Sequence, residues 1–173
     1  LPTIRSRVKT VNIPLFTKKE LLEYGKTVFE DKARLEVAVS LSGGKVGELR
    51  RFYADETATE LYALCVSVLH SMRSASDVLY YASKLANYKI ADVISVLKVL
   101  LGKIGRIICG EEEKDGKINE AAALFTAGAV VDIVERLNEL EKSVNFNGNK
   151  TMLTDEVLFA VMEGKHRWQR LSV

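Results

Sequence analysis

The sequence has little of the residue types that stop helices or bind metals. It contains two prolines, two cysteines and two histidines in 173 residues. Both prolines, Pro2 and Pro14, lie near the start, so no later position has the fixed backbone that ends a helix. Cys65 and Cys109 are far apart, and neither has a second Cys or His at zinc-ligand spacing. We therefore expect neither a metal nor a cofactor.

Charge and hydropathy exclude other classes. The formal net charge is +2, which does not indicate a nucleic-acid binder, and the 47% hydrophobic and 28% charged residues are typical of a globular protein with a core. The longest apolar stretch, residues 90–108, contains four charged residues, so we expect no membrane span and no membrane partner. Both cysteines lie in apolar runs. We expect both to be buried, reduced thiols of a cytoplasmic protein.

The start of the chain has the pattern of a strand. Residues 8–13 alternate apolar and polar side chains between the two prolines. A single strand is not stable without a sheet. Because the chain also begins at Leu1 rather than Met, we expect it to be a C-terminal fragment whose sheet lies in a preceding part.

The pattern becomes helical at Thr17. Thr17 and Glu20 have the spacing of a capping box, in which each side chain bonds the backbone N–H of the other residue. We expect three short helices, over residues 17–30, 32–41 and 46–53. The second helix ends at Gly43 and Gly44, which adopt the left-handed conformation easily.

Longer apolar stripes follow Asp55. They predict helices over residues 61–72, 76–86, 90–108, 118–144 and 153–163. We expect Ser76 to cap the second of these helices. The helix over 90–108 is apolar well beyond one stripe, so it must be covered on several sides. The expected fold is therefore all-α, with two units that meet near Asp55 and a basic tail over residues 165–170.

Several motifs could carry chemistry, and each has a plainer interpretation. The sequence Ser42-Gly43-Gly44-Lys45 suggests a phosphate-binding loop, but that loop requires Gly at 39 and Ser or Thr at 46, and both positions are Val. His70 and His166 have no partners suggesting a triad or metal site, so we expect them to be structural or to face solvent. The tail from Lys165 to Arg170 either contacts nucleic acid or ends a helix, with Trp168 packed on the bundle.

The opening residues, Leu1-Pro2-Thr3-Ile4-Arg5-Ser6-Arg7-Val8, place two arginines before the expected strand. Taken alone they would be a solvated basic turn. They resemble the Ser-Arg-Cys segment of bacterial clamp loader subunits, members of the AAA+ family in DNA polymerase III, with Val8 in place of Cys.

Two further segments resemble the same family. Residues 35–52 are similar to its second-sensor region, where ATP-hydrolysing subunits carry an arginine and this chain has Gly47. That departure favours the delta-prime branch, which lacks the arginine. Residues 134–158 resemble the end of the delta-prime collar, although Asn149-Lys150 stands where many relatives have Asn-Pro.

The resemblance implies a domain organisation. Residues 1–16 would be the end of an AAA+ core, residues 17–54 a three-helix lid, and residues 55–173 a helical collar that mediates oligomerisation. The implied protein is a non-catalytic subunit of the clamp loader, within the DNA polymerase III holoenzyme.

The resemblance also implies partners and a site. Gamma/tau and delta subunits would complete a five-membered ring that loads the sliding clamp onto primed DNA during replication. Arg7, beside Ser6, would act in trans as an arginine finger at the ATP site of a neighbouring subunit, with Arg5 as the second choice.

Two alternatives stay open. The chain could be the lid and collar of the ATP-hydrolysing gamma/tau subunit, in which case an intact phosphate-binding loop would lie upstream. It could instead be an all-α nucleic-acid-binding module that uses the basic tail, in which case its binding would depend strongly on salt.

Overall fold

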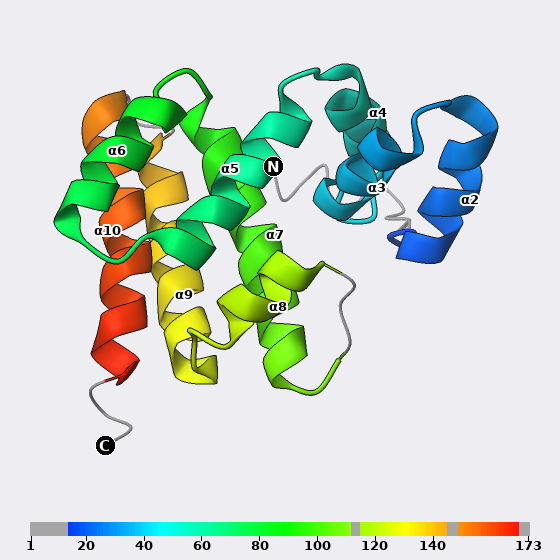
Figure 1. Ribbon diagram of the computed structural model, residues 1–173. Coiled ribbons are helices and arrows are strands. Elements are labelled where there is room, and N and C mark those ends of the chain that lie inside the picture. Colours follow the sequence, from blue (N-terminus) through cyan, green and yellow to red (C-terminus); the bar gives the residue numbers. More distant parts are fainter. Residues whose placement is uncertain (1–13, 112–114, 145–148, 170–173) are drawn as a thin grey trace, which may run out of the picture.

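A computed structural model describes residues 14–111, 115–144 and 149–169, with side chains described through residue 166. These residues form nine helices and no strand, so the all-α prediction is confirmed for them (Figure 1). The helices are α2 (Lys18–Val28), α3 (Lys32–Leu41), α4 (Val46–Ala54), α5 (Ala58–Ser71), α6 (Ala75–Leu85), α7 (Ile90–Ile108), α8 (Gly116–Ala122), α9 (Ala127–Val144) and α10 (Lys150–Gln169). The expected strand over 8–13 lies outside the described residues.

The short helices begin where the sequence predicts. Thr17 and Glu20 form both hydrogen bonds of the capping box at α2. Asp31 caps α3 by accepting from the backbone N–H of Arg34. The turn after α3 contains Gly43 and Gly44, with φ angles of 56° and 84°. These caps satisfy backbone groups that a helix end leaves unpaired, so local sequence is sufficient to place the ends.

Three later predictions about helix boundaries are wrong. Ser74, not Ser76, caps α6, because Ser74 and Asp77 form a capping box. The helix predicted over 118–144 is two helices, because the hydroxyl of Thr126 accepts from the Ala129 N–H and starts α9 there. The last helix is longer than predicted, since Asn149 accepts from the Thr151 N–H at its start and the helix continues to residue 169.

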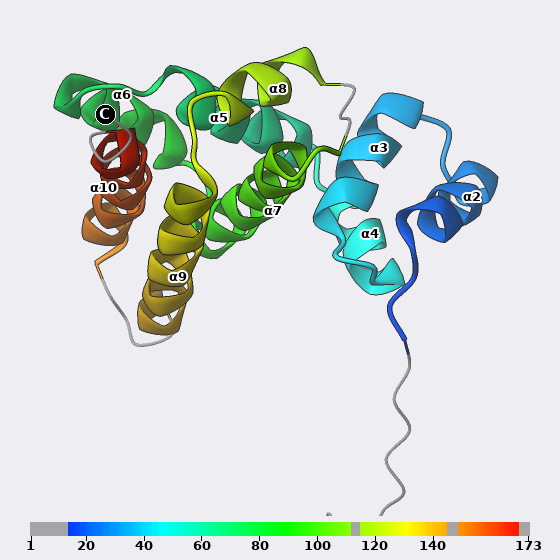
Figure 2. The ribbon, with the colours of Figure 1, turned by 90° about the horizontal axis from the view of Figure 1, so that it is seen from below.

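The helices form two neighbouring groups. Helices α2, α3 and α4 lie on one side, and α5 to α10 form a bundle in which α7 packs on α5, α8 and α9 (Figures 1 and 2). Within the bundle α10 lies between α9 and α6. Helix α3 joins the two groups, because it packs on α5 and α7 as well as on α2 and α4. The buried side chains of both groups form one continuous core.

Helix α7 is covered on several sides, as its broad apolar surface predicts. Its fully buried residues include Val96, Leu97, Leu100, Leu101 and Ile104. A buried Leu or Ile is stabilised by roughly 1.5–3 kcal/mol relative to an exposed one, so α7 contributes much of the free energy of folding. None of the helices in the described ranges is long and apolar enough to cross a membrane.

The two cysteines differ. Cys65 is buried in α5, and burial raises the pKa of its thiol, as expected for a core residue. Cys109 is exposed, so the prediction that it is buried is wrong. It follows the last residue of α7 and precedes Gly110, whose φ of 97° turns the chain away from the bundle. The apolar run that contains Cys109 therefore ends at the surface.

Candidate functional site

The turn between α3 and α4 has a defined geometry. The Ser42 hydroxyl donates to the Val39 carbonyl at 2.8 Å, and the Lys45 N–H donates to the Ser42 carbonyl at 3.1 Å. The turn lies between two helices, where a phosphate-binding loop would follow a strand. The geometry thus agrees with the failed motif spacing, and the turn is a structural connection.

The first described residues pack on this turn. The Phe16 N–H donates to the Gly44 carbonyl at 2.9 Å. A Cβ atom on Gly44 would lie 2.8 Å from the Leu15 Cβ, so only glycine allows this approach. Residues 14–16 are therefore held against the α3–α4 turn. Ser6, Arg7 and Arg5 lie outside the described residues.

Helix α4 offers no free arginine to a ligand. Gly47 is exposed in its first turn, and a Cβ there would meet no atom within 4 Å, so a side chain would have room at this position. The Arg50 guanidinium donates to the Tyr24 hydroxyl. Arg51 pairs with Glu48 at 2.9 Å and with Asp92 of α7 at 3.1 Å. Burial lowers the pKa of Arg51, but the bonds to Asp92 and Glu48 outweigh it and raise the pKa.

An open groove of about 370 Å³ lies between this turn and α7. Its lining includes Lys45 and Glu48 from the α4 side and Ser95 and Lys98 from α7. The Lys98 ammonium is paired with Glu141 of α9 at 2.9 Å. The groove is open, and apolar side chains such as Leu41 and Val99 line it together with the polar ones, so it has room for a ligand.

His70 lies in a cluster that the sequence did not suggest. Its Nε2 atom is 3.1 Å from a carboxylate oxygen of Glu120, and its Nδ1 atom is 3.0 Å from the Ser71 hydroxyl. A serine and a carboxylate on opposite nitrogens of a histidine have the connectivity of a hydrolytic triad. The signal was not visible in sequence because Glu120 belongs to α8, which only tertiary packing brings to α5.

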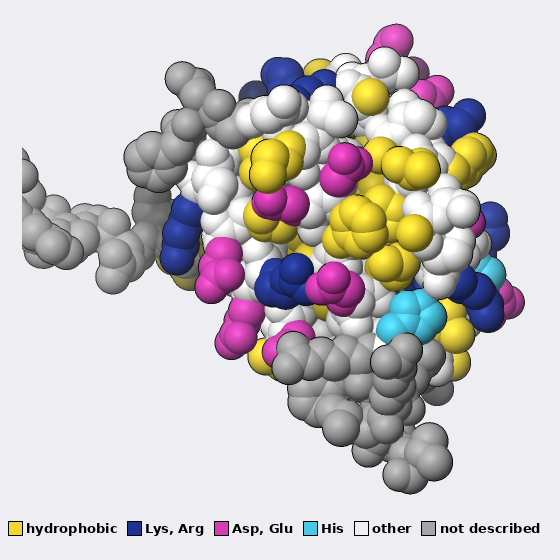
Figure 3. Space-filling view, turned by 90° about the vertical axis from the view of Figure 1, so that its left-hand side faces the viewer, with side chains coloured by type: hydrophobic (Ala, Val, Ile, Leu, Met, Phe, Trp, Pro, Cys, Tyr) yellow, Lys and Arg dark blue, Asp and Glu magenta, His cyan; other side chains and the backbone are white. Residues whose placement is uncertain are grey.

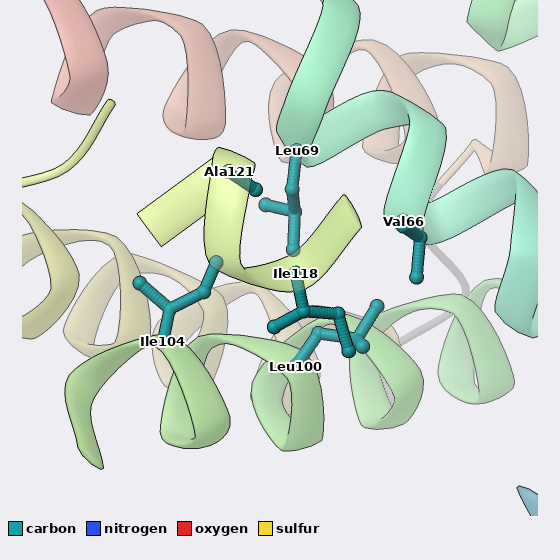
Figure 4. A pocket seen from close by; sticks show the side chains of 6 residues that line it. All are labelled: Val66, Leu69, Leu100, Ile104, Ile118 and Ala121. Carbon is teal, nitrogen blue, oxygen red and sulfur yellow. The ribbon is translucent and has the colours of Figure 1, made fainter. Parts of the chain in front are cut away.

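The surroundings of this cluster do not suit acyl transfer. Ser71 is the last residue of α5, so backbone carbonyls and the negative end of the helix dipole lie there, where an oxyanion would need N–H donors. The pocket between α5, α7 and α8 (Figure 4) is apolar, includes none of the cluster's three side chains in its lining and has no room for a water molecule. Its lining residues are Val66, Leu69, Leu100, Ile104, Ile118 and Ala121. His70 is thus a partly exposed side chain between Glu120 and Ser71, which agrees with the expectation of a structural or solvent-facing histidine, although the sequence did not predict these partners.

Lys165 lies within α10, whereas the sequence analysis expected it in a basic tail after the last helix, so that boundary is wrong. Its side chain is 4% exposed, and the ammonium donates to the carbonyls of Leu69 at 2.8 Å and Met72 at 3.1 Å. It also lies 5.3 Å from the centroid of the Phe125 ring. The ammonium satisfies carbonyls at the C-terminal end of α5, where cations are favoured. Burial, and then the nearby Arg73, lower the pKa of Lys165 to about 8.

The remaining tail residues have different positions. The His166 ring lies 3.0 Å from the Arg73 carbonyl, and its side chain is exposed. The side chains of Arg167 and Trp168 lie outside the described residues, as does all of Arg170. Helical spacing could have placed Lys165 inside the bundle, because it follows the buried Val161 by four positions.

Among the described residues, no group of three or more His, Cys, Asp or Glu side chains could hold a metal ion. Comparison of the chain with protein-family models, with curated proteins and with solved structures found no match.

Proposed function

We propose that the chain is the lid and collar part of a non-catalytic clamp loader subunit of the delta-prime type. In this proposal residues 1–16 end an AAA+ core, residues 17–54 are the lid and residues 55–173 are the collar. The subunit joins gamma/tau and delta subunits in a five-membered ring and helps load the sliding clamp onto primed DNA. The observation that carries the proposal is the opening segment, whose Ser6-Arg7 pair resembles the Ser-Arg segment of clamp loaders.

The order of the described elements supports this proposal. Three helices of 9 to 11 residues come first, and a bundle follows that contains the four longest helices, α5, α7, α9 and α10, which is the order that a lid and a collar require. Gly47 supports the non-catalytic type, because ATP-hydrolysing relatives place an arginine at this position. The arginines that follow in α4 do not substitute for it, since Arg50 and Arg51 are bonded to Tyr24, Glu48 and Asp92.

The mechanism assigned to Arg7 is electrostatic. A guanidinium is charged at any physiological pH, and its planar donors fit phosphate oxygens better than the point charge of a lysine. Placed at the ATP site of a neighbouring subunit, it stabilises the charge that develops as the phosphoryl group transfers. Ser6 positions the segment beside it.

The test uses the full-length subunit assembled with gamma-type and delta subunits. Arg7→Ala is expected to reduce clamp-stimulated ATP turnover at the neighbouring site by about 10³-fold or more while leaving ring assembly intact. Arg7→Lys should restore little turnover, and Arg5→Ala should have a smaller effect than Arg7→Ala. Wild-type turnover and clamp loading with Arg7→Ala would refute the finger assignment. Failure of the wild-type subunit to enter the ring would refute the proposed function itself.

The position of Lys165 weakens the alternative that the basic tail binds nucleic acid. Lys165 is buried and bonded to two carbonyls, so in this conformation its ammonium cannot reach a phosphate. Strongly salt-dependent binding of DNA or RNA by the chain alone would favour that alternative over a ring subunit.

A further inference from the structure

Helices α6 and α10 share an exposed apolar surface on one flank of the bundle. Four large hydrophobic side chains are exposed there: Leu79 (70%), Tyr80 (57%), Met152 (61%) and Phe159 (37%). Figure 3 shows hydrophobic side chains gathered on this flank, with acidic and some basic side chains among and beside them. We call these four residues the α6/α10 face.

The two helices that form the face are held together at both ends. The Lys150 ammonium at the start of α10 donates to the Ala86 carbonyl at the end of α6. At the other end, the His166 ring lies 3.0 Å from the Arg73 carbonyl, just before α6. The helices therefore run antiparallel along their length, and the face is a fixed surface.

Two carboxylates lie within the apolar stripe of α10. Met152, Asp155, Glu156 and Phe159 are spaced i, i+3, i+4 and i+7, so they share one side of the helix. Asp155 and Glu156 are partly exposed, and in the described part of the chain neither has an ion pair or a side-chain hydrogen bond. Glu163 of the same helix differs, because it is paired with Arg136 of α9 at 2.7 Å.

We propose that the α6/α10 face docks a helix of a partner protein in which apolar side chains are flanked by Lys or Arg. Apolar surface supplies the driving force for such contacts, and opposite charges fix their orientation and register. Lys84 lies 5.6 Å from the Tyr80 ring centroid, so the α6 side carries a cation while the α10 side carries carboxylates. The basic flank of the partner helix therefore lies along α10.

The two carboxylates of α10 disfavour a second copy docked α10 against α10, nucleic acid and anionic membranes. A second copy placed with α10 against α10 would bring the carboxylates of Asp155 and Glu156 close to their equivalents. Nucleic acid and anionic membrane surfaces would be repelled by the same pair. The inference goes beyond the proposed function and does not depend on it.

A display library tests the proposal with the complete chain as bait. The library consists of single-helix peptides with leucine fixed at i, i+3 and i+7, and with flanking positions drawn equally from Lys, Arg, Asp, Glu and Gln. We expect the selected peptides to be enriched in Lys and Arg on one flank. Their affinity is then measured by fluorescence anisotropy on variants whose fold is checked by circular dichroism.

The variants separate charge from apolar contact. The double variant Asp155→Asn/Glu156→Gln should weaken binding of the selected peptide about tenfold at low salt. Phe159→Ala should weaken it about tenfold, because this ring belongs to the apolar surface that the partner covers. The controls remove equivalent groups elsewhere, with Glu23→Gln/Glu36→Gln for charge and Val28→Ala for apolar surface, and should leave affinity unchanged.

Three outcomes would overturn the proposal. They are an absence of binders, selected peptides with neutral or acidic flanks, and binders that respond to the control variants as much as to the variants of the face. Analytical sedimentation tests for a fourth outcome that would overturn the proposal. A dimer of the chain that Phe159→Ala dissociates would assign the face to a second copy.

Discussion

The two groups of helices are stabilised in different ways. Helix α4 buries two side chains, Leu49 and Phe52, whereas α7 buries nine residues. In the first group, aromatic and guanidinium contacts supplement the small core. Phe29 stacks on Tyr53 with ring centroids 4.0 Å apart, and the Arg34 guanidinium lies 5.3 Å from the Tyr53 ring.

The difference shows how the short helices remain folded. Isolated helices of 9 to 11 residues are marginal in water, so α2, α3 and α4 need tertiary support. Two polar contacts join the first group to the bundle. Lys103 of α7 donates to the Ser40 hydroxyl of α3 at 3.3 Å, and Arg51 of α4 pairs with Asp92 of α7 at 3.1 Å. The first group is thus expected to open more easily than the bundle.

The largest expected effect comes from the centre of the bundle. Leu97→Ala removes a fully buried side chain of α7 and should lower the free energy of unfolding by about 3–5 kcal/mol. Chemical denaturation followed by circular dichroism measures this change. Leu21→Ala in α2 is the matched variant. Hydrogen exchange should show its effect confined to α2, α3 and α4, and equal loss of protection across α5 to α10 would contradict the comparison.

The second prediction concerns how the stability of the bundle depends on pH through Lys165. The pKa of Lys165 is about 8 in the folded protein, below its ordinary value of 10.5 in the unfolded chain. Between these values the unfolded state binds more protons, so the contribution of Lys165 to stability rises with pH, by roughly 1 kcal/mol per pH unit at most. Lys165→Met should lack this rise. Denaturation of both proteins from pH 7.5 to 10.5 measures the free energy of unfolding at each pH. If this free energy changes with pH equally in both proteins, the low pKa of Lys165 is contradicted.

The third prediction concerns the turn that joins α3 to α4. Gly44→Ala places a Cβ 2.8 Å from the Leu15 Cβ in a left-handed backbone, and should cost about 2 kcal/mol. Exchange of the Phe16 amide should become faster, because residues 14–16 are displaced. Gly43→Ala is the control, since it has a φ of 56° but open space around its Cβ. Equal exchange in both variants would mean that residues 14–16 do not depend on this approach.

The smallest expected effect is at the surface between the two groups. Arg51→Ala removes the pair with Asp92, in which the arginine side chain is 46% exposed. Such pairs contribute about 0.2–1 kcal/mol and weaken in salt. A double-mutant cycle with Asp92→Ala measures the coupling. A coupling that is unchanged in high salt would show that the pair is buried when the groups dock.

Local signals in the sequence predicted part of this fold well. The capping box at Thr17, the glycine turn and the span of α7 depend on residues close in sequence, so periodicity and caps were sufficient. The break before Ala127 was missed because Phe125 continued the apolar stripe across it. Its buried ring packs from a connecting segment instead of from a helix.

The sequence by itself determined the all-α class, most helix positions and the failure of the phosphate-binding motif, because these follow from neighbouring residues. Only the tertiary structure decided that Lys165 is a buried donor, that Glu120 reaches His70 and that Cys109 is exposed. The first two outcomes depend on segments distant in the chain, because helical periodicity does not tell which segment will cover a given side chain, whereas Cys109 is exposed because the chain turns away from the bundle at Gly110.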